Sequence, residues 1–161
     1  MKKFVEYNIS VRSNGDEVEL SAIEKPVSKD EILSFADKYE RGGKKSVGDG
    51  MASLDREVPA KIDEELADKI REIAQKAYRA IDACGLVRID FMVDESRPDK
   101  PFIIEINTIP GSMSYYLWEA VGESFTEQIS HVIEDAVKQF ESRYTLDLEY
   151  ESDIVEKFVS G

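Results

Sequence analysis

Alternating apolar and polar positions open the sequence and predict a pair of β-strands. Residues 5–11 alternate in this way, and so do residues 18–23. The stretch between them reads Ser13-Asn14-Gly15-Asp16, a composition typical of a tight hairpin turn. We therefore expect an antiparallel hairpin that ends at Pro26.

Two later segments have the period of an amphipathic helix. In residues 66–81 the apolar side chains share one face, with Asp63 at the N-cap position and Gly85 just past the end. The second segment opens with Ser124-Phe125-Thr126-Glu127, which has the spacing of a capping box. Its apolar stripe consists of Phe125, Ile129, Val132, Ile133, Ala136, Val137 and Phe140.

A second hairpin is predicted in the middle of the chain. Residues 86–93 and 102–109 read as strands, and the polar turn 95–99 joins them. Short helices are expected after Ser28 and over residues 114–121. Since the strands come in hairpins rather than in strand–helix–strand units, the sequence predicts an α+β fold with a mainly antiparallel sheet packed against helices.

Charge and cysteine content narrow the range of functions. The chain has 34 acidic and 21 basic residues, a net charge of -13, so we expect neither nucleic acid nor a membrane as a partner. No apolar run reaches the length of a membrane span, and the one cysteine, Cys84, cannot form an intramolecular disulfide. We expect a buried structural thiol at Cys84 and a cytoplasmic location. Because His131 is the only histidine, carboxylates, cations and backbone amides must carry the chemistry.

Four polar residues at alternating positions of the second hairpin are the candidate chemistry. Arg88 and Asp90 share one face of their strand, and Glu105 and Asn107 share one face of theirs. If the two strands pair, the four side chains meet on one side of the sheet. Two carboxylates, an amide oxygen and a cation suit magnesium bound together with nucleotide phosphates. From this pattern alone, a solvated polar face is the simpler interpretation.

The residues after Asn107 favour the functional interpretation. Residues 108–114 turn sharply from strand to helix, and backbone amides at such a turn form an anion-binding nest. A loop over residues 41–56, with four glycines, Lys44 and Lys45, is long enough to be a lid over a site. The apolar residues between the polar ones are expected to face the core: Val87, Ile89, Phe91, Ile104 and Ile106.

The second hairpin and its turn resemble the signature of the D-alanine–D-alanine ligase family within the ATP-grasp superfamily. The matching text is Arg88-Ile89-Asp90-Phe91 and Glu105-Ile106-Asn107-Thr108-Ile109-Pro110-Gly111. Further segments resemble the family in the same order: Glu6-Tyr7-Asn8, Asp37-Lys38-Tyr39 and Val58-Pro59-Ala60. The resemblance covers roughly residues 4–141, but only the C-terminal part of a family enzyme. It implies the C-terminal half of an ATP-grasp domain over residues 1–145 and an acidic tail over residues 146–161.

The resemblance implies a metal and catalytic centre on the second hairpin. Asp90, Glu105 and Asn107 would hold two Mg²⁺ ions, with Mn²⁺ as an alternative, that bridge the phosphates of ATP. Arg88 and the amide of Gly111 would stabilise the charge on an acyl-phosphate and on the tetrahedral oxyanion that forms when an amine attacks it.

The resemblance also implies roles for residues outside the hairpin. Lys38 would contact the ATP phosphates, and Phe4 and Val5 would belong to the wall around the adenine. Tyr39 would close over the site together with the lid loop, and Glu6 would organise the substrate side.

The segment after Gly111 departs from the family. It is shorter than the typical ligase segment by about four residues, which leaves the acceptor amino acid open. The candidates for holding the acceptor carboxylate are Ser112, Ser114 and Tyr116.

The resemblance implies part of an ATP-dependent carboxylate–amine ligase, in the first place a D-alanine–D-alanine ligase of peptidoglycan precursor synthesis. The substrates would be ATP and D-alanine, and the partner would be the missing N-terminal half of the same protein. The piece alone is expected to be inactive. A ligase for another amino-acid pair and a non-catalytic ATP-grasp-like binding or regulatory module are the alternatives. A homodimer is expected if an apolar face is left uncovered.

Overall fold

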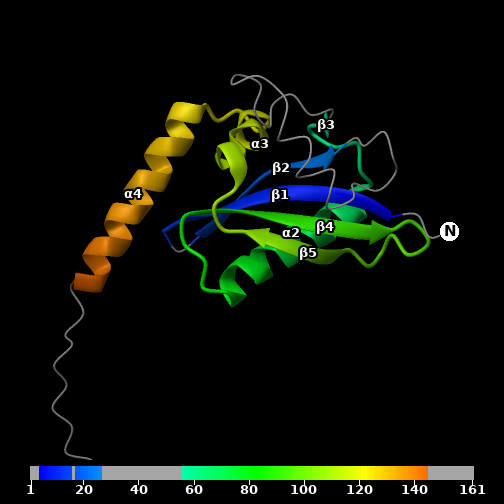
Figure 1. Cartoon of the computed structure of the whole chain (residues 1–161), viewed down its shortest axis with the longest axis horizontal. Coiled ribbons are helices and arrows are strands. Elements are labelled where there is room, and N and C mark those ends of the chain that lie inside the picture. The colour runs from blue at the N-terminus through cyan, green and yellow to red at the C-terminus, as the bar shows by residue number, and fades with distance from the viewer. Residues whose placement is uncertain (1–3, 16, 27–55, 145–161) are drawn as a thin grey trace, which may run out of the picture.

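A five-stranded antiparallel sheet lies at the centre of the computed structural model, which describes residues 4–15, 17–26 and 56–144 (Figure 1). The order of strands across the sheet is β3-β2-β1-β4-β5, so the two predicted hairpins lie side by side, with β1 and β4 paired in the middle. This arrangement confirms the predicted α+β fold. The strands are β1 (Phe4–Asn14), β2 (Glu17–Pro26), β3 (Arg56–Glu57), β4 (Leu86–Asp94) and β5 (Phe102–Asn107).

Helices pack against the sheet and at its edge (Figure 1). Within the described ranges these are α2 (Glu64–Ala80), α3 (Tyr115–Glu119) and α4 (Phe125–Tyr144), and a 3-10 turn, Gly111–Ser114, precedes α3. In this described part of the chain, no helix combines the length and the apolar character needed to cross a membrane.

Two of these helices begin at the caps that the sequence predicts. The Asp63 carboxylate accepts hydrogen bonds from the amides of Glu65 and Leu66 at the start of α2. At the start of α4, the Glu127 amide donates to Ser124 Oγ, and the Ser124 amide donates to the Glu127 carboxylate. This reciprocal pair is the capping box.

The odd-numbered residues of β1 and β4 form the main hydrophobic core with α2. Ile9, Val11 and Ile89 are fully buried there, or nearly so, because α2 covers this face of the two central strands. The side chains that α2 contributes are Leu66, Ala67, Ile70, Ala74 and Tyr78.

The even-numbered residues of β1 and β4 point to the opposite face, which is polar and also buried. Asn8, Ser10, Arg88 and Asp90 are at most 9% exposed. α3 covers part of this face with Trp118, and its indole Nε1 donates to Ser10 Oγ at 3.1 Å. The polar residues that the sequence places on alternating positions are therefore inside the protein, and each needs a partner there.

α4 is attached to the domain through polar side chains. Gln128 is fully buried and donates to the carbonyl of Met113 at 2.6 Å. Asp135 accepts hydrogen bonds from Ser13 Oγ at 2.6 Å and from the Gly85 amide at 3.2 Å. The predicted apolar stripe lies on a different side of the helix, where Phe125, Ile133, Val137 and Phe140 are exposed.

Two sequence expectations are wrong. Ile104 is 42% exposed rather than in the core, because a β-bulge beside Asp90 shifts the register. Phe91 therefore lies opposite Ile103, and Ile103 packs against the core instead. Cys84 is exposed, because α2 ends at Ala80 and leaves the cysteine in the loop before β4.

The sequence pattern also missed strand β3. It lies at the end of the predicted loop and pairs only with Lys25 and Pro26, too short a strand to show an alternation. The helix after Ser28, residues 41–55 of the predicted lid and the acidic tail over 146–161 lie outside the described residues.

The bulge assignment can be tested by the same substitution on the two paired strands. Ile89→Ala is expected to lower the free energy of unfolding by about 2–5 kcal/mol, because it removes a fully buried side chain and leaves a cavity. Ile104→Ala is expected to change the free energy by less than about 1 kcal/mol, because this side chain lies at the bulge. Urea unfolding followed by far-UV circular dichroism measures both. Equal losses would contradict the bulge.

Candidate active site

A row of polar side chains crosses the sheet on the face opposite α2. The register pairs Asn8 on β1 with Glu24 on β2 and with Asp90 on β4, and it pairs Asp90 with Glu105 on β5. Directly paired residues of antiparallel strands share a face. The row therefore spans four strands, and its two ends are carboxylates.

Arg88 forms a buried ion pair with Asp90, a member of this row. Arg88 Nε donates to Asp90 Oδ1 at 2.7 Å, and Nη2 donates to Oδ2 at 2.9 Å, which is the bidentate geometry of a strong pair. Asn107 lies opposite Arg88 in register and donates from Nδ2 to Asp90 Oδ2 at 3.3 Å. Burial alone would lower the pKa of Arg88, but the bonds to Asp90 outweigh it and raise the pKa above its ordinary value. The guanidinium therefore stays charged inside the protein.

A second polar cluster surrounds Glu24. Asn8 Nδ2 donates to Glu24 Oε1 at 2.8 Å, and Arg56 Nη1 donates to Oε2 at 3.2 Å. The Arg56 guanidinium also lies 4.0 Å from the centre of the Tyr116 ring, which holds α3 over this face. Burial and then the Glu24 carboxylate raise the pKa of Tyr116 well above its ordinary value. The phenol therefore stays protonated and can serve as a hydrogen-bond donor.

The turn between β5 and α3 has a strained backbone. Ser112, Met113 and Ser114 have φ angles of 52°, 51° and 50°, in the left-handed region that side-chain-bearing residues rarely adopt. Each such residue costs on the order of 1–3 kcal/mol and persists only where its surroundings fix it. Here the Met113 amide donates to the Pro110 carbonyl at 2.9 Å, and Gln128 holds the Met113 carbonyl.

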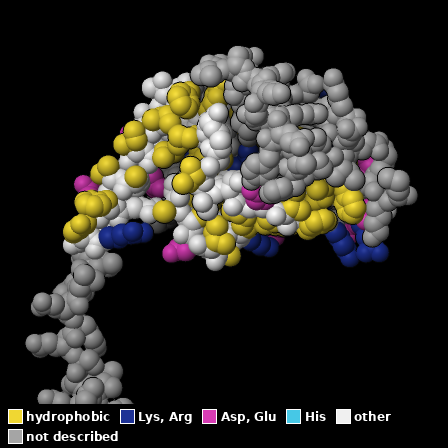
Figure 2. All heavy atoms as spheres, in the orientation of Figure 1, with side chains coloured by type: hydrophobic (Ala, Val, Ile, Leu, Met, Phe, Trp, Pro, Cys, Tyr) yellow, Lys and Arg dark blue, Asp and Glu magenta, His cyan; other side chains and the backbone are white. Residues whose placement is uncertain are grey.

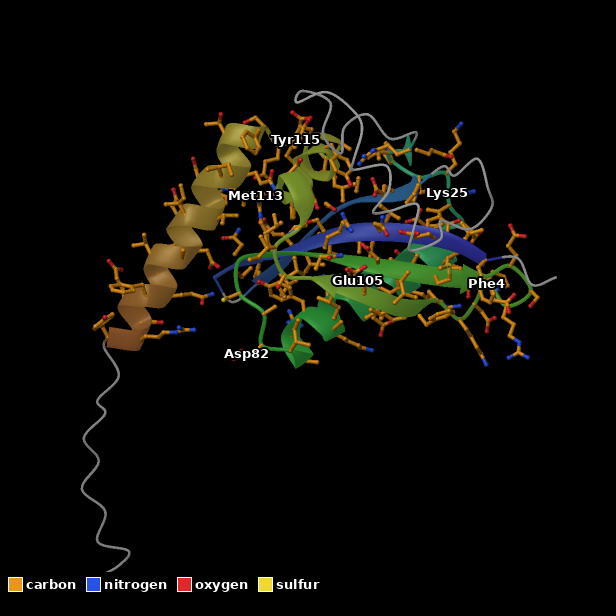
Figure 3. The ribbon with its side chains drawn as sticks, in the orientation of Figure 1. Phe4, Lys25, Asp82, Glu105, Met113 and Tyr115 are labelled. Carbon is orange, nitrogen blue, oxygen red and sulfur yellow. The ribbon has the colours of Figure 1, made fainter. Side chains whose placement is uncertain are left out.

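Ser114 is a second unusual feature of this turn. Its side chain is fully buried, and its Oγ has no hydrogen-bond partner among the described residues. A buried hydroxyl without a partner is uncommon in a folded protein, and it is one mark of a binding site. Figure 3 shows this turn, labelled at Met113 and Tyr115, above the sheet that carries Glu105.

An apolar surface adjoins the polar row near the N-terminal end of β1. Met92 lies two positions beyond Asp90 on the same face and is paired with Phe102. The rings of Phe4 and Phe102 meet edge to face, with centroids 6.5 Å apart. Val5 packs against the core on the α2 side, so the structure does not bring it to this surface.

The side chains of the hairpin suit a hard cation such as Mg²⁺. Asp90, Glu105 and Asn107 offer only oxygen ligands, and Asn107 uses its amide nitrogen toward Asp90, which leaves its Oδ1 as an acceptor. Glu105 is exposed. Among the residues that the structure describes, no cluster of three or more His, Cys, Asp or Glu side chains could hold a metal. Two carboxylates and one amide oxygen suit an ion that takes further ligands from phosphate and water.

The remaining predicted site residues are placed less centrally. Glu6 lies on the polar face of β1, opposite Met92, and Ser112 is exposed at the turn. Lys38 and Tyr39 lie outside the described residues.

Sequence reasoning missed the cluster of Asn8, Glu24 and Arg56. One signal was present, because Glu6, Asn8 and Ser10 alternate with apolar residues along β1 and so define a polar face there. Glu24 and Arg56 give no such signal. Their contact depends on the pairing of β2 with β1 and with the two-residue strand β3.

The fold is similar to that of solved ligase structures. The chain superposes on a D-alanine–D-alanine ligase from Coxiella burnetii with a TM-score of 0.65 at 21% identity, over 88% of this chain and 34% of that one. For the VanG D-Ala:D-Ser ligase from Enterococcus faecalis the TM-score is 0.59 at 22% identity, over 81% and 35%. For a Bacillus anthracis D-alanine–D-alanine ligase complexed with ATP it is 0.61 at 17% identity, over 86% and 40%. The chain thus shares its fold with a part of each of these ligases.

The sequence comparison narrows this class to one family. A family model described as D-ala D-ala ligase C-terminus matches residues 2–134, and the chain belongs to that family. The D-alanine–D-alanine ligase of Thermosipho melanesiensis is 35% identical over 124 residues, 77% of this chain and 31% of the relative. The ligase of Nocardia farcinica is 45% identical over 85 residues, 50% of this chain and 23% of the relative. The chain thus spans less than a third of the length of these relatives.

The ion pair gives a stability prediction. Asp90→Asn is expected to lower the free energy of unfolding by about 3–5 kcal/mol, because it leaves the Arg88 guanidinium charged and buried without its counter-ion. Glu105→Gln, the same kind of change at the exposed neighbour in the row, is expected to cost less than about 0.5 kcal/mol. Urea unfolding measures both variants.

A second substitution separates the charge from the packing. Adding Arg88→Met to Asp90→Asn is expected to recover part of the loss, because no unpaired charge then remains. A loss below about 1 kcal/mol for Asp90→Asn alone would show that the pair is not buried as described.

Proposed function

We propose that this chain is the C-terminal catalytic portion of an ATP-dependent ligase that joins two D-alanine molecules. One observation carries the proposal. In a chain of the D-alanine–D-alanine ligase family, the buried Arg88–Asp90 pair is bonded by Asn107, the last residue of β5 before the strained turn that follows Gly111. The named activity of the Thermosipho and Nocardia relatives supports the choice of D-alanine. The product would serve peptidoglycan precursor synthesis in the cytoplasm, where ATP is available.

The reaction consists of a phosphoryl transfer followed by an acyl transfer. A carboxylate oxygen of the first D-alanine attacks the γ-phosphorus of ATP, and ADP leaves with the electrons of the broken P–O bond. The amine of the second D-alanine then attacks the acyl carbon of the resulting acyl-phosphate. Phosphate leaves, the amine loses a proton, and an amide bond remains. Both steps gather negative charge on oxygen, so fixed donors are the main requirement.

Arg88 is suited to stabilise that charge. Its Nε and Nη2 are occupied by Asp90, and its Nη1 makes no hydrogen bond to a described residue. Asp90 therefore fixes the orientation of the guanidinium and leaves one edge for an oxyanion. The Gly111 amide, at the start of the left-handed turn, is the second donor.

Asp90, Glu105 and Asn107 are the side chains that would hold Mg²⁺, or Mn²⁺, in this site. The ion, when bound, would neutralise charge on the phosphates. Asp90 then has two tasks, because its carboxylate also holds Arg88.

One end of the polar face suits the nucleobase of ATP, and the other end suits the carboxylate of the acceptor amino acid. The apolar surface of Phe4, Met92 and Phe102 offers a place for a nucleobase. At the other end, the protonated phenol of Tyr116 and the unpaired Ser114 Oγ are donors for an acceptor carboxylate, with Ser112 beside them. Lys38 and Tyr39 stay predictions for the phosphates and the lid.

The identity of the acceptor amino acid depends on Ser112, Ser114 and Tyr116. A solved neighbour is described as a D-Ala:D-Ser ligase, so proteins of this fold accept different second amino acids. Tyr116 packs against the Arg56 guanidinium, which Glu24 holds in place, and it would set the size and polarity of the acceptor pocket.

Because the chain spans under a third of its relatives, the test uses a chimera in which it replaces the matched segment of the Thermosipho melanesiensis ligase. The chimera is expected to release ADP in a Mg²⁺- and D-alanine-dependent manner. Asn107→Ala in the chimera is expected to reduce turnover by about 100-fold or more, because it disturbs a metal ligand and a contact of Asp90. A coupled ADP assay measures the rate, and this chain alone is expected to be silent.

The matched control is Asn14→Ala, which removes an exposed asparagine at the end of β1. It is expected to leave turnover within about twofold of the unchanged chimera. A folded chimera that releases no ADP with D-alanine, or one in which Asn107→Ala is as active as the control, would refute the proposal.

A further inference from the structure

The helix α4 is held against the domain by a few polar side chains. Figure 1 shows the helix at the edge of the molecule, and Figure 2 shows apolar side chains exposed along it. Its buried residues are instead Gln128 and Asp135, which lie about two turns apart on one face of the helix. Burying an amide or a carboxylate is costly unless it is hydrogen-bonded. The partners of these two side chains therefore identify the contacts that fix α4.

Asp135 connects α4 to the strands that carry the polar row. Its carboxylate accepts hydrogen bonds from Ser13 Oγ near the end of β1, at 2.6 Å, and from the Gly85 amide just before β4, at 3.2 Å. Before the helix begins, Glu123 forms an ion pair with the buried Arg12 of β1. The position of α4 is therefore set relative to β1 and β4.

Gln128 connects the same helix to the turn after β5. Its Nε2 donates to the Met113 carbonyl at 2.6 Å, and its Oε1 is buried without a partner among the described residues. A leucine would fill a similar volume without burying an unpaired oxygen, so the amide contributes to the turn rather than to packing. The rings of Phe125 and Tyr115 meet beside this contact, with centroids 5.5 Å apart. Figure 3 labels Met113 and Tyr115 next to α4.

The carbonyl that Gln128 holds belongs to the peptide that joins Met113 to Ser114. A peptide unit is planar, so a hydrogen bond to its oxygen fixes the orientation of the whole unit. That unit lies within the three left-handed residues, which persist only where their surroundings fix them. The bond therefore also fixes the direction of the Ser114 side chain, whose buried Oγ has no partner among the described residues.

We propose that Gln128 is a positioning residue for the acceptor amino acid: from α4 it holds the turn in the conformation that directs Ser114 Oγ toward the acceptor. This inference rests on the proposed ligase function and adds a residue that acts through the turn. Arg88 and the metal-binding side chains stand on β4 and β5 and do not depend on the Met113 carbonyl. Loss of the bond therefore impairs the attack of the acceptor amine and leaves the formation of the acyl-phosphate in place.

The chimera, carrying this chain through Tyr144, separates the two steps. Hydroxylamine attacks the acyl carbon of the acyl-phosphate, its nitrogen loses a proton, phosphate leaves and a hydroxamate forms. Because hydroxylamine has no carboxylate, it does not need the acceptor donors. Gln128→Leu is expected to lower the ratio of dipeptide to hydroxamate by about tenfold or more, while ADP release with hydroxylamine stays within about threefold. The control is Gln75→Leu, the same change on α2, which should leave both quantities unchanged.

A carboxyl at this position makes the contact depend on pH. In Gln128→Glu the protonated carboxyl can donate to the Met113 carbonyl, whereas the carboxylate cannot. Burial raises the pKa of the introduced carboxyl above its ordinary value, so the contact is present at low pH and is lost as the pH rises through this pKa. Relative to the unchanged chimera at each pH, the ratio of dipeptide to hydroxamate should fall with rising pH for Gln128→Glu. For Gln128→Leu it should stay low throughout.

Hydrogen exchange of the 161-residue chain tests the support of the turn without any reaction. The Met113 amide donates to the Pro110 carbonyl within the turn, at 2.9 Å. NMR should show that this amide exchanges about tenfold faster in Gln128→Leu than in the unchanged chain or in Gln75→Leu.

Two outcomes would overturn the proposal. One is exchange at the Met113 amide that Gln128→Leu does not change. The other is an active chimera in which Gln128→Leu matches the control, or in which the ratio for Gln128→Glu does not fall with pH. A chimera that releases no ADP, although exchange rises in Gln128→Leu, would support the positioning of the turn by Gln128 and refute the proposed ligase function.

Discussion

The buried pair of Arg88 and Asp90 sets the conditions that the rest of the structure must meet. A charged pair in a protein interior is stable only if its geometry is fixed and its remaining hydrogen-bonding capacity is satisfied. Two strands supply the fixed geometry, because both residues stand on β4 and Asn107 reaches Asp90 from β5. A slip of the β4 register by one residue would turn the pair into the apolar core, so the register itself must be strongly specified.

The register of β4 is fixed by packing on the opposite face of the sheet. The fully apolar contact between α2 and the odd-numbered residues of β1 and β4 has only one good register, because Ile9, Val11 and Ile89 must all be buried at once. Packing of the hydrophobic face thus fixes the strand register, and the register fixes the positions of the polar side chains on the other face. The bulge beside Asp90 adjusts only the part of β5 before Glu105 and leaves the pairing of Arg88 with Asn107 in place. Side chains held in this way are preorganised for charge stabilisation before a ligand arrives.

The sequence predicts those features that depend on neighbours along the chain. Both hairpins, the Asp63 cap and the capping box at Ser124 follow from local spacing, and so does the meeting of Arg88, Asp90, Glu105 and Asn107 on one hairpin face. The missed features depend on contacts between distant segments. No local pattern reveals that a bulge expels Ile104, or that Arg56 and Tyr116 come to lie together across the polar face.

The left-handed backbone of the three turn residues is another feature that the sequence does not predict. Nothing in the text Ser112-Met113-Ser114 requires a positive φ, and glycine would adopt it at less cost. Gln128, which lies on α4 and is distant in sequence, stabilises this conformation by donating a hydrogen bond to the Met113 carbonyl. The anion-binding interpretation of this turn could be predicted from its position after a strand, whereas its backbone geometry could not.

Trp118 lies against the polar face and makes changes there observable by fluorescence. It is the only tryptophan in the chain, its Nε1 donates to Ser10 Oγ, and the Arg12 guanidinium lies 4.2 Å from its ring centre. Ser10 is in turn the cross-strand neighbour of Arg88. The indole is therefore a built-in fluorophore one residue away from the ion pair. All tryptophan emission comes from this one position, so a rearrangement of this face can be followed by intrinsic fluorescence without a label.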